Sequence, residues 1–308
     1  MNPPTGLRYR DNAMSRKIAV IFDFDDTLAP DSTSAFLASM GVDVDDFWGR
    51  RVKRLLEGHW DPIPAYLYEM IVESNARPAS DRITRDRLEA FAGQVDFFPG
   101  VKEIFPALRA EASAIDPTVV IEFYLISSGI GEILRGTSIA DEFTDIWACD
   151  FHYGDEGEII YPRNVVSFTE KTRFIFQISK GLVGSEARAN IAEVNRKMRG
   201  GFVIPFEQMV MIGDGQTDVP CFSLIKRYGG SAIGVCDPEA PSKWEKARLL
   251  VTDDRVESMC AAVYREGAGL HRTLHKAVKE IAQKIAGKTY AAGSVEQPAS
   301  TGRRERHT

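Results

Sequence analysis

The chain has 308 residues, of which 44% are hydrophobic and 27% are charged, and its formal net charge at pH 7 is −6. This composition is typical of a globular protein with enough apolar residues for one large domain or two smaller ones. The acidic balance provides no electrostatic attraction for nucleic acid or for an anionic membrane surface, so we expect neither as a partner.

The two ends of the chain are polar and lack an apolar period. We expect residues 1–16 to be a flexible N-terminal extension, with Met14 as an alternative start, and residues 288–308 to be a disordered tail. We expect neither a signal peptide nor a membrane span, because no apolar run is long enough. The four cysteines are widely spaced, which is typical of reduced thiols in a cytoplasmic protein.

The first predicted strand runs directly into two carboxylates. Lys17–Phe22 is apolar without alternation and rich in β-branched residues, which predicts a strand buried on both faces of a parallel sheet. Asp23 and Asp25 follow, and side chains two positions apart leave an extended backbone on the same side. Ligands bind at this end of the strands in open α/β sheets. Two acids so close must bind a cation, share a proton or differ in pKa.

Residues 32–98 contain no strand signal, and leucine and aromatic residues recur there at helical spacing. Asp61 followed by Pro62 predicts the start of a helix, and residues 45–56 and 80–91 predict two more. We expect this insertion to be a helical subdomain over the carboxyl end of the first strand. The aromatic residues of this insertion could line a specificity pocket, but most are expected in its core: Trp48, His59, Trp60, Tyr66 and Tyr68. Its basic residues could attract an anionic substrate, but a charged outer face is the favoured interpretation: Arg50, Arg51, Lys53 and Arg54.

Further apolar runs alternate with amphipathic helical stretches along the rest of the chain. They predict strands at residues 119–126, 143–148, 208–212, 231–235 and 249–251. This alternation predicts an α/β fold with a Rossmann-like, doubly wound parallel sheet. We expect residues 17–31 and 99–287 to form this core, and residues 32–98 to form a helical cap inserted after the first strand.

The second predicted strand ends in Ser127, Ser128 and Gly129, and Lys171 lies in an amphipathic stretch at 168–178. We expect the serines at the start of a helix, where hydroxyl groups and backbone amides bind anions, although they are also ordinary turn residues. A lysine in such a helix is usually solvated. These two segments alone predict no specific chemistry.

A stronger pattern follows the strand predicted at 208–212. Gly213 and Gly215 flank Asp214, and glycines permit a sharp turn and a close approach of backbone to a ligand. Asp218 lies one helical turn later on the same side as Asp214. A simple helix cap is the alternative interpretation of Asp218.

Taken in order, these segments resemble the motifs of the haloacid dehalogenase (HAD) superfamily of aspartate-nucleophile phosphotransferases. Residues 23–28 match its Asp-x-Asp-x-Thr-Leu motif, and Ser127 matches its second motif. Lys171 fits the basic third motif, and Asp214 with Asp218 fits the fourth. The resemblance covers most of the chain between the two ends, and the insertion corresponds to what the family calls a C1 cap.

The resemblance implies a role for each acid. Asp23 would attack phosphorus to form an aspartyl-phosphate, and Asp25 would protonate the leaving oxygen and then deprotonate the attacking water. Mg²⁺ would be held by Asp23, by the backbone carbonyl of Asp25 and by Asp214.

The remaining motif residues would bind or support the phosphoryl group. Ser127, Ser128 and Lys171 would hold its oxygens, with Lys180 as the alternative to Lys171. Asp218 would orient the lysine or a metal-bound water, and Thr27 is a further supporting residue.

These roles predict a Mg²⁺-dependent phosphomonoester hydrolase that acts on a small phosphorylated metabolite. An acid at Asp25 is not needed to displace a halide, so we do not expect a dehalogenase. Asp26 and residues 29–32 depart from the pattern of phosphoserine phosphatases, so we do not assign phosphoserine. Two alternatives stay open: a phosphotransferase with an alcohol acceptor, and a catalytically idle binding or regulatory protein on the same scaffold.

Overall fold

The computed structural model describes residues 15–198, 201–215, 217–239, 244 and 250–293. Residues 1–14 of the expected extension and 294–308 of the expected tail lie outside this set. The last helix, α12 (Gly269–Gly293), runs past position 288, where we expected the disordered tail to begin. Across these described ranges, no helix has both the length and the apolar character needed to cross a membrane.

Seven strands form one sheet in the order β4-β3-β2-β1-β5-β6-β7. All neighbouring strands are parallel except β3 and β4, which confirms the predicted α/β class with a largely parallel sheet. The strands are β1 (Lys17–Phe22), β2 (Val120–Ile130), β3 (Phe143–Tyr153), β4 (Ile159–Asn164), β5 (Met209–Gly213), β6 (Ser231–Cys236) and β7 (Ser258–Ala261).

The prediction of a strand at residues 249–251 is wrong. Leu250 and Val251 are helical, and the edge strand beside β6 is β7 instead. A run of three apolar residues has no measurable period, so it does not distinguish a strand from the buried side of a helix. The antiparallel strand β4 was not predicted, and β2 and β3 both run several residues past their predicted ends.

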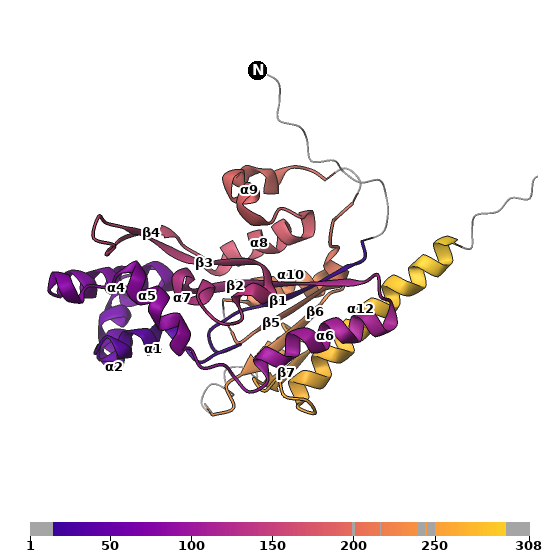
Figure 1. Cartoon of the computed structure of the whole chain (residues 1–308), viewed down its shortest axis with the longest axis horizontal. Coiled ribbons are helices and arrows are strands. Elements are labelled where there is room, and N and C mark those ends of the chain that lie inside the picture. Colours follow the sequence, from indigo (N-terminus) through magenta and orange to yellow (C-terminus); the bar gives the residue numbers. More distant parts are fainter. Residues whose placement is uncertain (1–14, 199–200, 216, 240–243, 245–249, 294–308) are drawn as a thin grey trace, which may run out of the picture.

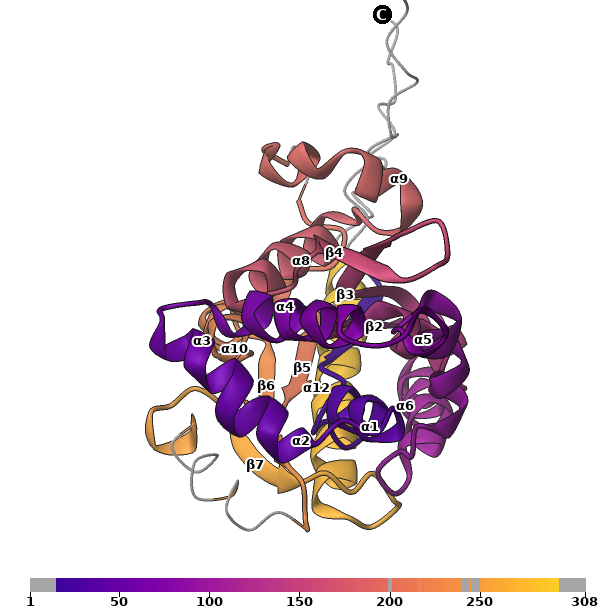
Figure 2. The same ribbon diagram turned by 90° about the vertical axis from the view of Figure 1, so that its left-hand side faces the viewer.

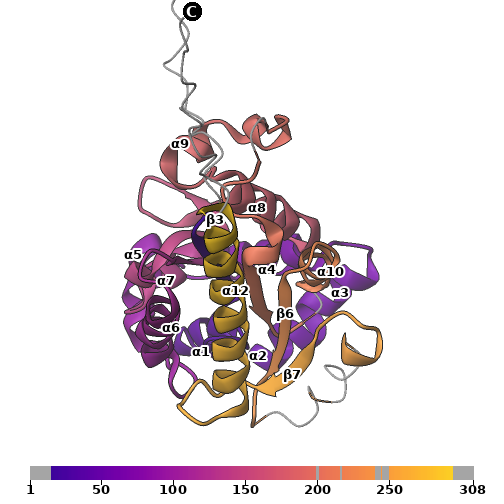
Figure 3. The ribbon, with the colours of Figure 1, turned by 90° about the vertical axis from the view of Figure 1, so that its right-hand side faces the viewer.

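Helices cover both faces of the sheet, as Figures 1 and 3 show. α8 (Phe168–Lys180) and α10 (Val219–Arg227) pack together on one face, while α6 (Val101–Ile115) packs with α12 on the other. Between them β1 is fully buried from Ile18 onward, as its unbroken apolar sequence predicts. The shorter elements outside the cap are α7 (Gly131–Arg135), η4 (Ala140–Glu142), α9 (Gly184–Ala189), η5 (Ile191–Asn195) and η6 (Phe206–Gln208).

The helices between β1 and α6 lie together at one end of the sheet (Figures 1 and 2). Asp61 caps α4 as predicted, because its side chain accepts a hydrogen bond of 3.0 Å from the amide of Ile63. These cap elements are α1 (Ser32–Ser39), α2 (Val44–Asp46), the π-helix η1 (Phe47–Val52), α3 (Lys53–Glu57), α4 (Pro62–Asn75), η2 (Ala79–Asp81), α5 (Arg85–Phe91) and η3 (Ala92–Gln94).

The helix predicted at 80–91 is interrupted, because Thr84 adopts an extended backbone and its hydroxyl caps α5. This extended segment pairs with the turn between β3 and β4. The amide of Ile159 donates to the carbonyl of Ile83 at 3.0 Å, and the amide of Arg85 donates to the carbonyl of Gly157 at 2.9 Å. The β3–β4 hairpin therefore fastens the cap to the edge of the sheet.

Candidate active site

Asp23 and Asp25 stand at the carboxyl end of the central strand. The amide of Asp23 donates to the carbonyl of Ile212 at 2.9 Å, so the pairing of β1 with β5 continues to this residue. The chain then turns sharply, with the amide of Leu28 bonded to the carbonyl of Phe24 at 2.8 Å. Asp26 takes a left-handed backbone conformation in this turn, with φ of 56°. The turn leaves Asp23 only 5% exposed at the base of the site.

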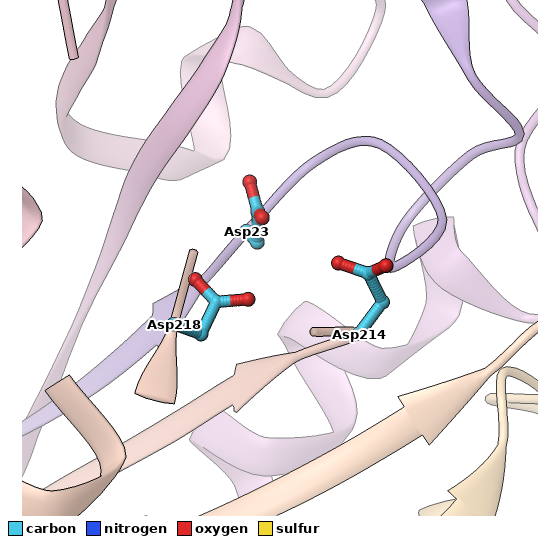
Figure 4. A group of neighbouring side chains, drawn as sticks. All are labelled: Asp23, Asp214 and Asp218. Atoms are coloured by element: carbon cyan, nitrogen blue, oxygen red, sulfur yellow. The ribbon is translucent and has the colours of Figure 1, made fainter. Parts of the chain in front are cut away.

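Three carboxyl groups gather where β1 and β5 end (Figure 4). Asp23, Asp214 and Asp218 each offer one oxygen, and these oxygens lie within 4.8 Å of one another. Asp214 directly follows β5, which neighbours β1, so the parallel register brings the first and fourth motifs together. We expected Asp23 and Asp214 together in this cluster, whereas the metal role that we predicted for Asp25 concerns its backbone carbonyl.

Lys171 on α8 is the cation of this cluster. Its buried ammonium group donates to Asp23 Oδ2 at 2.7 Å, to Asp218 Oδ1 at 2.8 Å and to Thr217 Oγ1 at 3.0 Å. The alternative, Lys180 at the other end of α8, instead donates to backbone carbonyls outside the site. The geometry therefore places Lys171 beside Asp23, as the third motif requires.

Asp218 does not serve as a helix cap through its side chain. It precedes α10 without a side-chain capping bond, and its second oxygen accepts from the amide of Gly215 at 3.4 Å. Gly213 is needed for this arrangement, because a Cβ atom there would lie 2.3 Å from Asp218 Oδ2. Asp218 is thus held against Lys171, which agrees with an orienting role and not with the simple cap alternative.

The charges in this cluster are not balanced by the protein alone. Burial, with the nearby charges of Asp23 and Asp218, raises the pKa of Asp214 well above its usual value. Burial also raises the pKa of Asp218 to about 7, despite the opposing effect of Lys171. Burial alone would lower the pKa of Lys171, but its two carboxylate partners raise it. A cluster of oxygen donors with surplus negative charge fits a hard divalent cation.

Asp25 lies against the second motif. Its Oδ1 accepts a hydrogen bond of 2.7 Å from the amide of Ser32. A Cβ atom at Gly129 would lie 2.7 Å from Asp25 Oδ2 and 3.3 Å from Ser127 Oγ, so these three residues are in close contact. Loss of solvent, followed by the charge of Asp31, raises the pKa of Asp25 to about 8. The raised pKa favours the protonated form of this carboxyl group.

The serines of the second motif are not at the start of a helix, contrary to our expectation. β2 continues to Ile130, its register with β3 shifts between positions 126 and 130, and α7 begins only afterwards. Ser127 Oγ accepts from the amide of Gly129 at 3.0 Å within this irregular strand end. Ser128 Oγ is buried and has no hydrogen-bond partner among the described residues, so it is free to bind a ligand oxygen.

A cavity of about 410 Å³ opens between this sheet edge and the cap. Of the predicted site residues, Thr27, Lys171 and Asp218 do not line it. Thr27 is buried in the turn, where its carbonyl accepts from the hydroxyl of Tyr264 at 2.9 Å. The lining residues are Asp23, Asp25, Asp26, Asp31, Thr33, Trp48, Val52, Leu56, Pro62, Ile63, Tyr66, Ser127, Ser128, Gly129, Phe168, Asp214 and Thr217.

Several of these residues were not predicted. Asp31 lies just past the first motif, and Phe168 opens α8 three residues before Lys171, where no spacing rule applies. Trp48 and Tyr66 line the cavity, although the aromatic residues of the cap gave no signal that separated them from its core. By contrast, Trp60 and Tyr68 are exposed and pack against each other. None of the four basic residues at positions 50–54 lines the cavity. Three of them are exposed, as expected for a charged outer face, whereas Arg51 is half-buried in ion pairs with Glu69 and Glu73.

No protein-family model matches the chain. A protein of Borreliella burgdorferi that is described only as uncharacterized is 26% identical over 293 residues, which span 84% of this chain and 96% of that protein. The similarity to this relative covers most of the chain, but the description of the relative states no function.

The chain is also similar to solved structures at lower identity. A HAD family hydrolase from Salmonella enterica subsp. enterica serovar Typhi aligns with a TM-score of 0.53 and 12% identity, covering 85% of this chain and 71% of that one. A phospho-aspartyl intermediate analogue of phosphoserine phosphatase aligns with a TM-score of 0.51 and 16% identity, covering 84% and 98%. A substrate-bound phosphoserine phosphatase complex gives 0.50 and 14%, covering 84% and 98%.

At these identities the similarity concerns the fold. The fold that the motif resemblance predicted is thus confirmed. The chain has the fold of the HAD hydrolases, with a distant structural likeness to phosphoserine phosphatases.

Proposed function

We propose that the protein is a Mg²⁺-dependent phosphomonoester hydrolase that acts through an aspartyl-phosphate on Asp23. One observation carries this proposal: the buried contact of Lys171 with Asp23 and Asp218, beside Asp214, at the base of a cavity that also contains Asp25. The fold shared with a HAD family hydrolase and with phosphoserine phosphatases supports it.

The two acids of the first motif have different surroundings and therefore different roles. Asp23 lies where it can attack phosphorus, and the ester bond to the leaving alcohol breaks as the bond to its carboxylate oxygen forms. Asp25 gives its proton to the leaving oxygen. In the second half of the reaction Asp25 takes a proton from water, which attacks phosphorus and releases Asp23 and phosphate.

The rest of the site positions and neutralises the phosphoryl group. Lys171, held in place by Asp218, would supply a positive charge. Ser127 and Ser128 line the cavity, and their hydroxyl groups would donate to phosphoryl oxygens. Mg²⁺ would be held by Asp23, by the backbone carbonyl of Asp25 and by Asp214, and when bound it neutralises charge on the phosphoryl oxygens.

We also propose that the enzyme works in the cytoplasm. None of the four cysteines, all of which lie in the described part of the chain, forms a disulfide. Three of them are buried in the core, and buried cysteines outside any disulfide are typical of proteins in a reducing compartment.

A panel of phosphorylated metabolites, incubated with the protein and Mg²⁺, tests the proposed hydrolase. Asp23→Asn is the blank, because the amide has nearly the same size but cannot attack phosphorus. We expect this variant to lose at least about a thousandfold in kcat while its thermal unfolding stays cooperative. Retention of more than a few per cent of the activity would contradict the role of Asp23.

The same panel separates the two alternatives. Transfer to an alcohol would appear as a new phosphate ester when alcohols are added to the assay, with less free phosphate released. A protein that bound Mg²⁺ but released no phosphate from any ester of the panel would instead be a binding or regulatory protein.

A further inference from the structure

The described lining of the cavity carries negative charge and no positive charge. The described lining residues include five carboxyl groups and no lysine, arginine or histidine. The proposed function already assigns Asp23 and Asp214 to the metal and Asp25 to proton transfer. Asp26 and Asp31 are left. Asp26 lies in the left-handed turn after β1, whereas Asp31 caps α1. The described hydrogen-bond donors to Asp31 are uncharged: the amide of Ser34 at 2.9 Å and the hydroxyl of Ser34 at 2.5 Å.

The arginine residues of the cap are engaged elsewhere. The guanidinium of Arg51 donates to Glu69 at 3.0 Å and to Glu73 at 2.6 Å, and that of Arg50 pairs with Asp46. Both pairings hold these side chains on the cap itself. No described residue is therefore placed to neutralise a carboxylate on the substrate, whereas Asp31 is placed to neutralise an ammonium group.

Two aromatic rings beside this carboxylate are fixed in position. The indole nitrogen of Trp48 donates to Ser34 Oγ at 2.7 Å, the same hydroxyl that binds Asp31. The hydroxyl of Tyr66 donates to the backbone carbonyl of Ser128. The ring centroids lie 5.7 Å apart with the planes tilted by 52°, and both residues line the cavity.

Rigid aromatic rings near a carboxylate are suited to a cation. The face of a tryptophan or tyrosine ring attracts an ammonium group, and the attraction grows when the cation is removed from water. Asp31 retains lone pairs for a further donor, because a carboxylate accepts up to about four hydrogen bonds. Val52 and Ile63 also line the cavity, and their apolar side chains suit the methylene groups of a short alcohol.

We propose that the substrate is the phosphate monoester of an amino alcohol, with its ammonium group against Asp31, Trp48 and Tyr66. This inference rests on the proposed hydrolase activity and specifies its substrate class. It also predicts discrimination against esters that carry a carboxylate, since a buried carboxylate without a partner is strongly disfavoured.

Three esters of similar size test the inference. Phosphoethanolamine carries only the ammonium group, phosphoserine adds a carboxylate to the same skeleton, and n-propyl phosphate carries neither charge. With the wild-type protein and Mg²⁺, we expect kcat/KM for phosphoethanolamine to exceed the values for both other esters by about tenfold or more.

Two variants locate the ammonium site. Asp31→Asn keeps an oxygen that can cap α1 but loses the charge, and Trp48→Leu keeps an apolar side chain but loses the aromatic face. In each we expect the ratio of kcat/KM for phosphoethanolamine to that for n-propyl phosphate to fall by about fivefold. This ratio cancels general damage to the site. Asp43→Asn is the matched control, because Asp43 caps α2 in the same way but does not line the cavity.

The outcomes are distinguishable. Phosphate release with equal or better turnover of phosphoserine, or equal turnover of n-propyl phosphate, would overturn the amino-alcohol assignment and leave the hydrolase intact. A fall in the ratio for Asp43→Asn as large as that for Asp31→Asn would also overturn it. No release from any of the three esters, or from the wider panel, would overturn the hydrolase itself.

Discussion

The ammonium nitrogen of Lys171 lies 2.7 Å from Oδ2 of Asp23, although the two residues are 148 positions apart in the chain. Both side chains are almost completely buried, and Asp218 shares the same lysine. The arrangement links the first, third and fourth motifs through one cation. In the proposed hydrolase it would provide the phosphoryl group with a fixed positive charge that needs no rearrangement when the substrate binds.

Replacement of this cation should affect both stability and activity. Lys171→Met leaves Asp23 and Asp218 buried without their partner, and loss of one member of a buried ion pair typically costs about 3–5 kcal/mol. We expect a lower free energy of unfolding in urea with EDTA present, together with loss of phosphate release. Lys180→Met is the matched control on the same helix, and equal effects of the two variants would contradict the assignment of Lys171.

The position of Asp214 in the carboxyl cluster predicts that it contributes to the affinity for Mg²⁺. Asp214→Ala removes an oxygen donor from the buried cluster, so Mg²⁺ should bind more weakly by at least about tenfold, since even indirect metal partners contribute about 10–100-fold. Titration calorimetry with Mg²⁺ and no substrate measures this directly. An unchanged dissociation constant would remove Asp214 from the set of metal ligands.

The raised pKa of Asp25 predicts how stability changes with pH when no metal is bound. Burial raises the pKa of Asp25 in the folded protein to about 8, from its ordinary value of 3.8. Between these values the folded state holds a proton that the unfolded state has released, so the contribution of Asp25 lowers stability as pH rises through this window.

Asp25→Asn removes this contribution, because the amide does not titrate and its oxygen can still accept from Ser32. In EDTA the variant should be more stable than the wild type by about 1 kcal/mol or more at pH 8, with the difference shrinking toward about pH 5. Thermal unfolding across this range measures it. A difference that did not change with pH would show that Asp25 is ionised in the folded protein.

The parts of the fold that could be predicted from the sequence are those with a long, unambiguous pattern. Lys17–Phe22 has the uninterrupted apolar run of a buried strand, and the Asp61-Pro62 pair has the chemistry of a helix start. The strand predicted at 249–251 was too short for any period to show. The hairpin partner β4 escaped prediction because its exposed edge carries polar residues and a proline.

The site could be predicted only where residue type itself signals chemistry. Paired acids after an apolar strand are rare enough to single out Asp23 and Asp25, and a glycine-flanked acid after a second apolar strand singles out Asp214. Trp48 and Tyr66 could not be separated from other aromatic residues of the cap, because their role depends on which face of a helix meets the cavity. That orientation is set by tertiary contacts such as the bond of Tyr66 to the carbonyl of Ser128.

Gly129 packs closely against the carboxyl group of Asp25, the proposed general acid. A Cβ atom at this position would lie 2.7 Å from Asp25 Oδ2, nearer than real Cβ contacts allow, so Gly129→Ala should push the carboxyl group aside. The carboxyl end of a side chain can move at little cost, so the fold should survive. Catalysis should suffer more, because a displacement of about 1 Å at a reacting group can reduce the rate by about a hundredfold.

Gly93→Ala is the matched control for the displacement of the Asp25 carboxyl group. Gly93 lies in the short helix η3 of the cap, where an added Cβ meets no atom within 4 Å. We expect Gly129→Ala to lower kcat for phosphate release with nearly unchanged thermal unfolding, and Gly93→Ala to change neither. If Gly129→Ala kept wild-type kcat, the close packing of the second motif against Asp25 would have no part in proton transfer. The acid would then be positioned by the amide of Ser32 alone.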